Sequence, residues 1–143
     1  MLEIDAAALI TALGETIGIP ALRFDAQGCC RLLFDGALMV ELRHLPAQER
    51  WLLSCPLRGA APDAQGQRLL LQGNFCGAGF GGGWAGLDNS GQAVLHLPVP
   101  QTQASAAALL TAVELLLSHA ERWEKRLQES SAPTPVRYPT DWA

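Results

Sequence analysis

Near the N-terminus, apolar side chains recur at steps of three and four, the spacing that lines one face of an α-helix. The positions are Leu2, Ala6, Leu9, Leu13 and Ile17, with Ile10 widening the stripe. Gly14 lies inside this pattern and is expected to weaken the helix. Gly18 then suits a helix end, and Pro20 prevents the helix from continuing.

A second helical stripe lies in the C-terminal part of the chain and is the clearest in the sequence. Its members are Leu109, Val113, Leu116, Ala120, Trp123 and Leu127. Thr102 or Ser105 can cap its start, and we expect Trp123 to be buried. Residues 130–143 contain three prolines, which predicts a single domain over residues 1–129 followed by a tail without fixed structure.

Between these helices the apolar period changes to two, which is typical of β-strands. Alternation over residues 30–34, 38–42 and 51–55 predicts three consecutive antiparallel strands. Asp35-Gly36 predicts the hairpin turn that joins the first two, because this turn favours residues that adopt positive φ. Residues 22–25 alternate in the same way over a shorter stretch.

The middle of the chain predicts a short and weak helix over residues 65–75. This segment contains the three consecutive leucines Leu69, Leu70 and Leu71. Pro62-Asp63 supplies a start signal. Gly66 and Gly73 each cost such a helix about 1 kcal/mol relative to alanine.

Two further strands are predicted beyond this helix. Short apolar segments flank residues 88–91, Asp-Asn-Ser-Gly, a sequence typical of a turn, and Pro98 and Pro100 are expected to end the second strand. The order of elements is then helix, three strands, helix, two strands, helix. This order predicts an α+β fold, in which an antiparallel β-sheet packs with three helices.

The predicted strands carry apolar side chains on both faces of the sheet. The positions opposite Leu32, Val40 and Leu53 are Leu33, Met39 and Leu52. One face can pack on the helices, whereas the other needs either a partner or cover from the C-terminal helix. Three aromatic residues around the glycine-rich residues 77–86 mark a second candidate contact surface: Phe75, Phe80 and Trp84.

Composition and charge exclude several classes of function. The chain has 143 residues, of which 49 % are hydrophobic and 17 % charged, as expected for one folded domain. A net charge of −4, with 10 Lys and Arg against 14 Asp and Glu, argues against nucleic-acid binding. The N-terminus carries acids where a secretory signal carries Lys or Arg, and no apolar stretch is long enough to span a bilayer. We therefore expect a cytoplasmic protein that binds neither nucleic acid nor membrane.

The four cysteines are Cys29, Cys30, Cys55 and Cys76. A vicinal pair plus two isolated cysteines is not the spacing of a disulfide framework, so we interpret them as buried thiols in a reducing compartment. The cysteines and histidines also lack the short paired spacing of a zinc site, so no metal is expected.

Gly77-x-Gly79-x-x-Gly82 matches the dinucleotide-binding fingerprint literally. That motif needs a strand before it and a helix after it, whose N-terminal N–H groups hold the pyrophosphate. Here the preceding residues favour a helix and the following residues a strand, so we interpret the run as a flexible connection or close-packed backbone. No combination of Cys, His, Ser and acidic residues has the specificity of an active site. We expect no enzyme and no cofactor.

Several segments, in their order along the chain, resemble the CesT/Tir family of type III secretion chaperones. The earlier ones are Leu13-Gly14, Ile17-Gly18-Ile19-Pro20, Leu22, Phe24-Asp25, Gly28, Leu32, Phe34-Asp35, Val40 and Leu42. The later ones are Leu70 through Asn74-Phe75, Gly82-Gly83 through Leu87-Asp88, Gly91, and then Leu116, Ala120, Glu121 and Trp123. The resemblance covers residues 5–128, and it is the order and spacing of the segments that make it specific.

The resemblance implies a cytoplasmic bacterial homodimer, without a cofactor or hydrolytic activity, that binds the N-terminal region of a secreted effector. Such a chaperone keeps this region extended and delivers it to the export apparatus, whose secretion ATPase is a further candidate partner. By position, the resemblance assigns the dimer interface to Leu69, Leu70, Phe75, Trp84 and Leu87. It assigns effector contacts, including a sheet edge for strand addition, to Leu13, Ile17, Leu22, Phe24, Leu32, Phe34 and Met39.

Two other interpretations remain open at this point. The same fold can serve a regulatory partner that sequesters a secretion regulator. Alternatively, the glycine run can belong to a small ligand-binding domain or enzyme. Because the middle of the chain is rich in glycine, the geometry of the dimer is the least determined part of the resemblance.

Overall fold

The computed structural model describes residues 5–34 and 37–131. Its helices are α1 (Ala6–Ile17), α2 (Ala64–Gly73) and α3 (Ala106–Ser131). Its strands are β1 (Cys29–Phe34), β2 (Leu38–Leu45), β3 (Arg50–Pro56), β4 (Trp84–Leu87) and β5 (Ala93–Pro100). Short 3-10 helices cover Pro46–Gln48, Phe75–Phe80 and Gln101–Gln103. The predicted order of elements and the α+β class are confirmed, whereas the predicted turn at Asp35-Gly36 lies outside the described residues.

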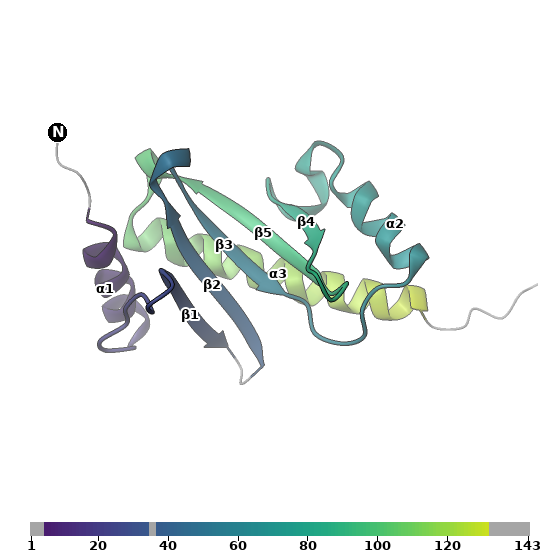
Figure 1. The fold of residues 1–143 in the computed structure, drawn as a ribbon, viewed down its shortest axis with the longest axis horizontal. Helices are drawn as coiled ribbons and strands as arrows, with labels where there is room; N and C mark the ends of the chain where they lie inside the picture. The colour runs from purple at the N-terminus through teal and green to yellow at the C-terminus, as the bar shows by residue number, and fades with distance from the viewer. Residues whose placement is uncertain (1–4, 35–36, 132–143) are drawn as a thin grey trace, which may run out of the picture.

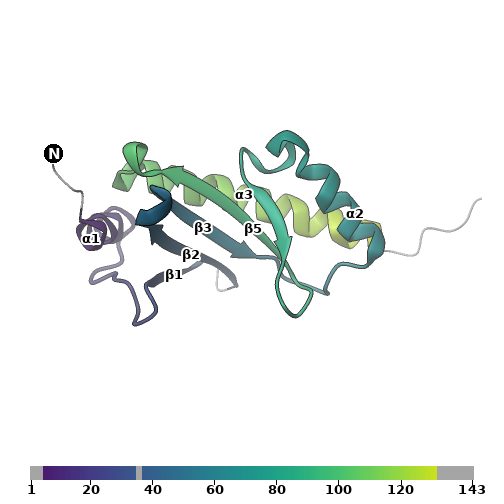
Figure 2. The same ribbon diagram turned by 45° about the horizontal axis from the view of Figure 1, so that its top comes forward.

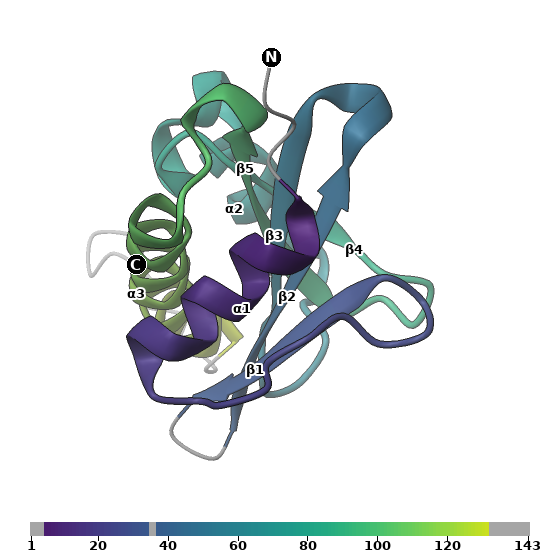
Figure 3. The same ribbon diagram turned by 90° about the vertical axis from the view of Figure 1, so that its left-hand side faces the viewer.

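The five strands form one antiparallel sheet in the order β1-β2-β3-β5-β4. Helices α1 and α3 lie on the same side of this sheet, and α3 runs along its length (Figure 1, Figure 3). Helix α1 and β1 lie at one end of the molecule, whereas α2 and β4 lie at the other (Figure 1, Figure 2). The chain therefore presents two different ends joined by one long helix.

The hydrophobic core lies between α3 and the inner face of the sheet. Strands β3 and β5 alternate between buried and less buried positions along their length. The inner face consists of Leu32, Leu38, Val40, Leu42, Trp51, Leu53, Cys55, Leu95, Leu97 and Val99. Helix α3 contributes Leu109, Val113, Leu116, Ala120 and Trp123 to the same core. The predicted C-terminal stripe is confirmed, and Trp123 is 2 % exposed, as the prediction of burial requires.

Side-chain and glycine caps define the helix ends. Asp5 Oδ1 accepts a hydrogen bond of 3.0 Å from the N–H of Ala7, and Gly18 ends α1 with φ at 78°, a conformation that glycine adopts at little cost. Asp63 accepts from the N–H of Gly66 over 2.8 Å at the start of α2. Ser105 Oγ accepts from the N–H of Ala108 over 3.0 Å, so Ser105 is the cap of α3.

Residues 22–25, which alternate as strand residues do, form no strand. Leu22 and Phe24 are partly buried and pack on the core, and the ring of Phe24 stacks on Trp51 with centroids 5.9 Å apart. The N–H of Asp25 then donates to the carbonyl of Cys29 over 2.8 Å and closes a turn. The alternation marks two apolar anchors in an irregular segment rather than a paired strand.

Strand β5 includes Pro98 and ends at Pro100, so the expectation that these prolines end the strand is confirmed for Pro100 and wrong for Pro98. Strand β4 pairs with β5 only as far as His96. The side chain of Asn74 forms hydrogen bonds with the main chain of Ala85 on the side of β4 that faces away from β5. The main-chain groups of the neighbouring residue, Trp84, therefore point toward β5. By the alternation of an antiparallel ladder, the position of Pro98 then faces the β4 side, where β4 has already ended. Its missing N–H removes no bond from the ladder with β3.

Part of the glycine-rich segment is packed closely against α3. The rings of Phe80 and Trp123 stack with centroids 4.8 Å apart, and Trp123 Nε1–H donates to the carbonyl of Gly79 over 2.9 Å. A Cβ on Gly73 would lie 2.7 Å from Trp123, and a Cβ on Gly79 would lie 2.8 Å from the backbone of Gly73. Strand β4, not a helix, follows this segment. The close-packed interpretation is therefore the correct one.

Helix α3 includes residues 130 and 131, and the rest of the predicted tail, residues 132–143, lies outside the described part. The domain boundary at residue 129 stays a prediction. In the described ranges, no helix combines the length and apolar character that crossing a membrane requires.

Replacing Gly73 by alanine tests the packing of α2 against α3. The new Cβ overlaps two aromatic rings, which costs about 1–3 kcal/mol, whereas the better helix propensity of alanine contributes at most about 1 kcal/mol. We expect the free energy of unfolding, measured by urea denaturation, to fall by about 1 kcal/mol. The exposed neighbour on the same helix gives the control Gln72→Ala, which should change stability by less than about 0.5 kcal/mol. Equal stability of the two variants would contradict the packing described here.

Candidate protein-binding surfaces

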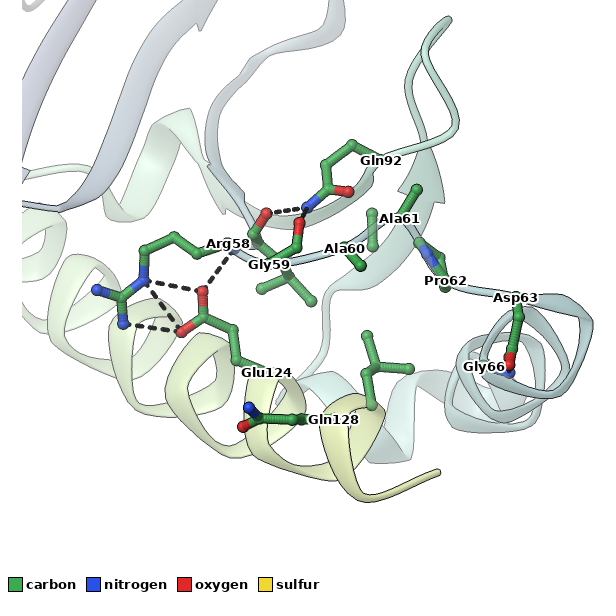
Figure 4. A pocket seen from close by; sticks show the side chains of 13 residues that line it. Arg58, Gly59, Ala60, Ala61, Pro62, Asp63, Gly66, Gln92, Glu124 and Gln128 are labelled. Atoms are coloured by element: carbon green, nitrogen blue, oxygen red, sulfur yellow. Dashed lines mark hydrogen bonds and ion pairs between the residues drawn. The ribbon is translucent and has the colours of Figure 1, made fainter. Parts of the chain in front are cut away.

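A pocket of about 250 Å³ lies between the loop of residues 57–63 and the C-terminal part of α3 (Figure 4). Arg58 pairs with Glu124 through Nη2 to Oε1 at 2.9 Å and Nε to Oε2 at 3.0 Å. The amide of Gln92 donates to the carbonyl of Leu57. These groups connect the loop to α3 and to the β4–β5 turn, so we interpret the pocket as a contact between structural elements and not as a ligand-binding site.

The outer edge of β1 is open to a further strand. At its start, the N–H of Cys29 donates to Asp25 Oδ1 over 3.0 Å, and its carbonyl accepts from the N–H of Asp25. Main-chain groups point alternately to the two sides along an antiparallel strand, so Arg31 and Leu33 present theirs at this same edge. Within the described residues, no other segment forms a hydrogen bond with these groups. The edge therefore offers the N–H and C=O groups of both residues to a partner.

The turn beside this edge is held by an ionised carboxylate. The hydrogen bond from the N–H of Cys29 lowers the pKa of Asp25, helped by the N–H of Gln27 and the charge of Arg31 and opposed by desolvation. Arg31 Nη1 lies 3.1 Å from Asp25 Oδ2, and Arg31 Nε lies 3.0 Å from Glu41 Oε1. Asp25 thus fixes where the open part of the edge begins.

Partly buried apolar side chains at the end of the molecule that holds α1 and β1 pack against the core (Figure 1). They include four of the residues predicted for effector contact: Ile17, Leu22, Phe24 and Phe34. Leu13 and Leu32, also predicted for this contact, are 0 % and 2 % exposed. These two residues belong to the core and support the surface from beneath.

Gly14 is explained by the close approach of the following segment to α1. A Cβ at this position would lie 2.6 Å from the carbonyl oxygen of Ile19 and 2.7 Å from Cβ of Leu22. The N–H of Ile19 also donates to the carbonyl of Gly14 over 2.8 Å. The residue that interrupts the helical pattern therefore allows Leu22 to pack across α1.

Met39, the seventh residue predicted for effector contact, lies on the outer face of the sheet. It pairs with Leu33, which is 63 % exposed. Together with Leu52 these side chains form the second apolar face that the sequence predicts. The alternative that the C-terminal helix covers this face is wrong, because the strand residues packed with α3 are those of the inner face. The predicted effector residues are thus divided between two faces that meet at the β1 edge.

At the other end of the sheet, the side chain of Asn74 closes part of the β4 edge. Asn74 Nδ2 donates to the carbonyl of Ala85 over 3.1 Å, and the N–H of Ala85 donates to Asn74 Oδ1 over 2.8 Å. The amide takes the place that a neighbouring strand residue would occupy. Strand addition is therefore favoured at β1 over β4.

A second apolar surface, the α2–β4 surface, consists of Leu71, Phe75 and Leu87. Their exposed fractions are 71 %, 78 % and 47 %. A pocket of about 160 Å³ between α2 and β4 adjoins Leu71 and Leu87. Large apolar side chains concentrated at one end of a small domain are typical of a contact with another protein.

The residues predicted for the dimer interface fall partly on this surface. Phe75 and Leu87 belong to it, Leu70 is 4 % exposed and lies beneath it, and Leu69 is partly buried against the core. Trp84 instead lies on the outer face of the sheet, opposite the buried Ala85. The prediction missed Leu71, although three consecutive leucines cannot share one face of a helix.

Cys29, Cys30 and Cys55 are buried, whereas Cys76 is exposed, so the expectation of burial is wrong for Cys76. Cys76 has φ at 55° in the turn after α2, and this turn holds its side chain outside the core. Burial raises the pKa of the Cys30 thiol to about 11 and that of Cys55 to about 12. All four cysteines are free, and the described residues contain no group of three or more His, Cys, Asp or Glu placed to hold a metal.

The sequence matches the Tir chaperone protein (CesT) family over residues 8–124. The chain belongs to this family. The resemblance inferred from the sequence is therefore confirmed, and the matched range includes α3 as far as Glu124. A comparison with curated protein sequences finds no match.

The solved structures with a similar fold include a chaperone–effector complex and a complex from a type III secretion system. The ExsC–ExsE complex is 27 % identical with a TM-score of 0.75, over 87 % of this chain and 97 % of that one. The HopA1–SchA chaperone–effector complex is 24 % identical with a TM-score of 0.73, over 86 % and 99 % of the two chains. The ExoU–SpcU complex from the type III secretion system of Pseudomonas aeruginosa is 19 % identical with a TM-score of 0.58, over 87 % and 99 %. The last two likenesses concern the fold alone.

Asn74→Ala removes the amide that holds β4. Two hydrogen bonds to Ala85 are lost, so we expect the free energy of unfolding to fall by about 1–3 kcal/mol. The amide hydrogen of Ala85 should exchange at least about tenfold faster, measured by NMR-detected hydrogen exchange. Asn89→Ala, in the exposed turn between β4 and β5, is the matched control. Unchanged exchange at Ala85 would show that Asn74 does not hold the strand.

Proposed function

We propose that this chain is a type III secretion chaperone that binds the N-terminal region of a secreted effector, keeps it partly unfolded and delivers it to the export apparatus. The observation that carries the proposal is membership of the CesT family over residues 8–124. The likeness to the ExsC–ExsE complex at 27 % identity supports it. The open β1 edge and the exposed apolar surfaces supply the means of binding.

The chaperone works without catalysis or a cofactor, in the bacterial cytoplasm. Membership of a chaperone family supports this part of the proposal. The candidate binding surfaces of the chain are a strand edge, at β1, and exposed apolar side chains. Such surfaces suit an extended peptide better than the turnover of a small molecule.

The effector segment adds a strand to β1. Arg31 and Leu33 provide its hydrogen-bonding partners, and alternate side chains of the segment reach the apolar residues on the helix side, Ile17, Leu22, Phe24 and Phe34. A disordered segment loses conformational entropy when it binds, so it needs a long and regular contact. Main-chain pairing provides such a contact for many sequences.

A second copy of the chain covers the α2–β4 surface. Burial of Leu71, Phe75 and Leu87 in both copies removes apolar area from water. Asn74 already occupies the main-chain groups of Ala85, so two β4 edges cannot pair continuously. We therefore expect side chains of α2 and of the following 3-10 helix to form most of the dimer interface.

Co-expression with the secreted protein encoded by the neighbouring gene tests the proposed function. We expect the two proteins to co-purify through the N-terminal region of the secreted protein, with two copies of this chain per effector by light scattering. A monomer that never retains a client would contradict the proposal. Capture of a regulator of secretion in place of an exported protein would favour the regulatory partner instead.

Leu33→Pro and Leu33→Ala together test strand addition at β1. Both variants lose the exposed side chain, but only proline removes the N–H that faces the open edge, and it leaves the bonds to β2 in place. We expect Leu33→Pro to weaken effector binding about tenfold more than Leu33→Ala, the effect of a hydrogen bond lost from an interface. Isothermal titration calorimetry measures both affinities. Equal affinities would place the effector away from the β1 edge.

Phe75→Asp tests the dimer interface. A carboxylate on the α2–β4 surface is costly to bury without a partner, so we expect a monomer at micromolar concentration in sedimentation velocity. Because Phe75 is 78 % exposed, the fold of the protomer should persist, as circular dichroism can verify. Leu33→Asp, the same change at an exposed leucine near the other end, is the control and should stay dimeric. A dimeric Phe75→Asp variant would show that the α2–β4 surface is not the dimer interface.

A further inference from the structure

The outer face of the sheet carries a row of side chains that crosses all five strands. The paired residues are Arg31, Glu41, Ser54, His96 and Trp84. Ser54 Oγ lies 2.7 Å from His96 Nδ1, and the ring of His96 lies 5.6 Å from that of Trp84. Burial lowers the pKa of His96. Four of the five side chains in this row are polar, and the row lies between the apolar positions Leu33 and Met39 on one side and Leu52 and Pro98 on the other.

The charge of this face is opposite in sign to that of the whole chain. The charged residues of the strands are three arginines, Arg31, Arg43 and Arg50, and one acid, Glu41. All four alternate with buried inner residues and so lie on the outer face. The chain as a whole has a net charge of −4. Asp25 and Glu41 both pair with Arg31, so the surplus of positive charge on this face lies at Arg43 and Arg50.

Two of these arginines retain capacity to bind an anion. Glu41 lies 3.0 Å from Arg31 but 3.5 Å from Arg43, whose side chain is 51 % exposed. Arg43 otherwise donates to the thiol of Cys29. The guanidinium of Arg50 lies 5.4 Å from the centroid of Trp84, and its Nε is buried without a hydrogen-bond partner. The indole thus holds the guanidinium of Arg50 in place without neutralising its charge.

Arg43 and Arg50 lie on either side of an apolar position. Leu52 pairs with Arg43 on the neighbouring strand and follows Arg50 by two residues on β3. Pro98 pairs with Leu52 from β5. We name Arg43, Arg50, Leu52, Trp84 and Pro98 the outer-face site. It combines two cations with an apolar floor, and Leu33 and Met39 extend the apolar area toward β1.

A partner on this site cannot use main-chain pairing with the sheet. Strand β3 pairs with β2 over Arg50–Ser54 and with β5 over Arg50–Pro56, so the residues beneath the site already pair with their neighbours in the plane of the sheet. A partner segment must satisfy its own backbone, which an α-helix does. Apolar residues along one side of the helix contact Leu52 and Pro98, and carboxylates at its flanks face the two arginines.

We propose that the outer-face site binds an acidic amphipathic helix of the client, with client carboxylates on Arg43 and Arg50. The inference rests on the proposed function and adds the chemistry of a second client segment. The strand that adds to β1 and the helix on the outer face are adjacent, because Leu33 lies at the β1 edge and also on the outer face. A client therefore continues from one contact to the other.

Two synthetic amphipathic peptides of about 20 residues, long enough to form a helix, provide the first test. They share one leucine stripe and carry either glutamate or lysine on the remaining face. We expect the glutamate peptide to bind the full-length protein at least about tenfold more tightly in calorimetry, with an affinity that falls as salt rises. Equal or tighter binding of the lysine peptide would overturn the proposal, as would binding by neither.

The double variant Arg43→Gln/Arg50→Gln provides the second test, with the co-purified client as ligand. We expect its affinity to fall about tenfold. Arg122→Gln/Lys125→Gln, on exposed positions of α3, changes the net charge equally and should have no such effect. If the wild-type chain retains a client and both variants bind it equally, the outer-face site is wrong while the proposed function stands. A shift of the monomer–dimer equilibrium in the first variant alone would assign the face to a second copy and would also overturn the proposal.

Discussion

Helix α3 covers the inner face of the sheet, where Leu109, Val113 and Trp123 join strand residues such as Trp51 and Leu95 in one core. Among the described residues, α3 is the one helix long enough for this purpose, and α1 and α2 pack against its two ends (Figure 1). The opposite face, the β1 edge and the side of α2 away from α3 are then left to other molecules. These surfaces are exposed because the helices form a single layer on one face of the sheet.

The same packing connects the α2–β4 surface to the core. Gly73 allows α2 to approach the Phe80–Trp123 ring pair, and Trp123 in turn holds Gly79 through its indole N–H. Asn74 joins the end of α2 to β4. Leu71 and Phe75 therefore belong to a segment that is fixed at three points, which limits the conformational entropy that this segment can lose in a contact. The glycines that weaken α2 as an isolated helix are what make this fixed arrangement sterically feasible.

The periodicity of the sequence was sufficient for the order of the elements, because strong alternation in β2 and β3 and a long stripe in α3 reflect a single buried face. The periodicity was insufficient where the same pattern of apolar residues can arise from two different structures. Leu22 and Phe24 alternate because both anchor an irregular segment, and Pro98 is tolerated because its position faces a side where β4 has ended. Of the predicted site residues, Phe75 and Leu87 are exposed while Leu13, Leu32 and Leu70 are buried. An apolar residue can serve the core or an interface, and only the direction of its side chain in three dimensions separates the two.

Charge gives a further distinction that composition conceals. The net charge of −4 suggests a basic client, yet the sheet presents three arginines and one acid on its outer face, while α1 carries Glu15 and no base. A client segment beside α1 therefore meets Glu15, whereas a segment on the outer face meets Arg43 and Arg50. Basic residues in a strand beside α1 and acidic residues in a helix on the outer face would both be favourable, whereas exchange of the two segments would place like charges together. The uneven distribution of charge therefore favours one placement of the two client segments over the other. Main-chain pairing alone does not make this distinction, because it accepts most sequences.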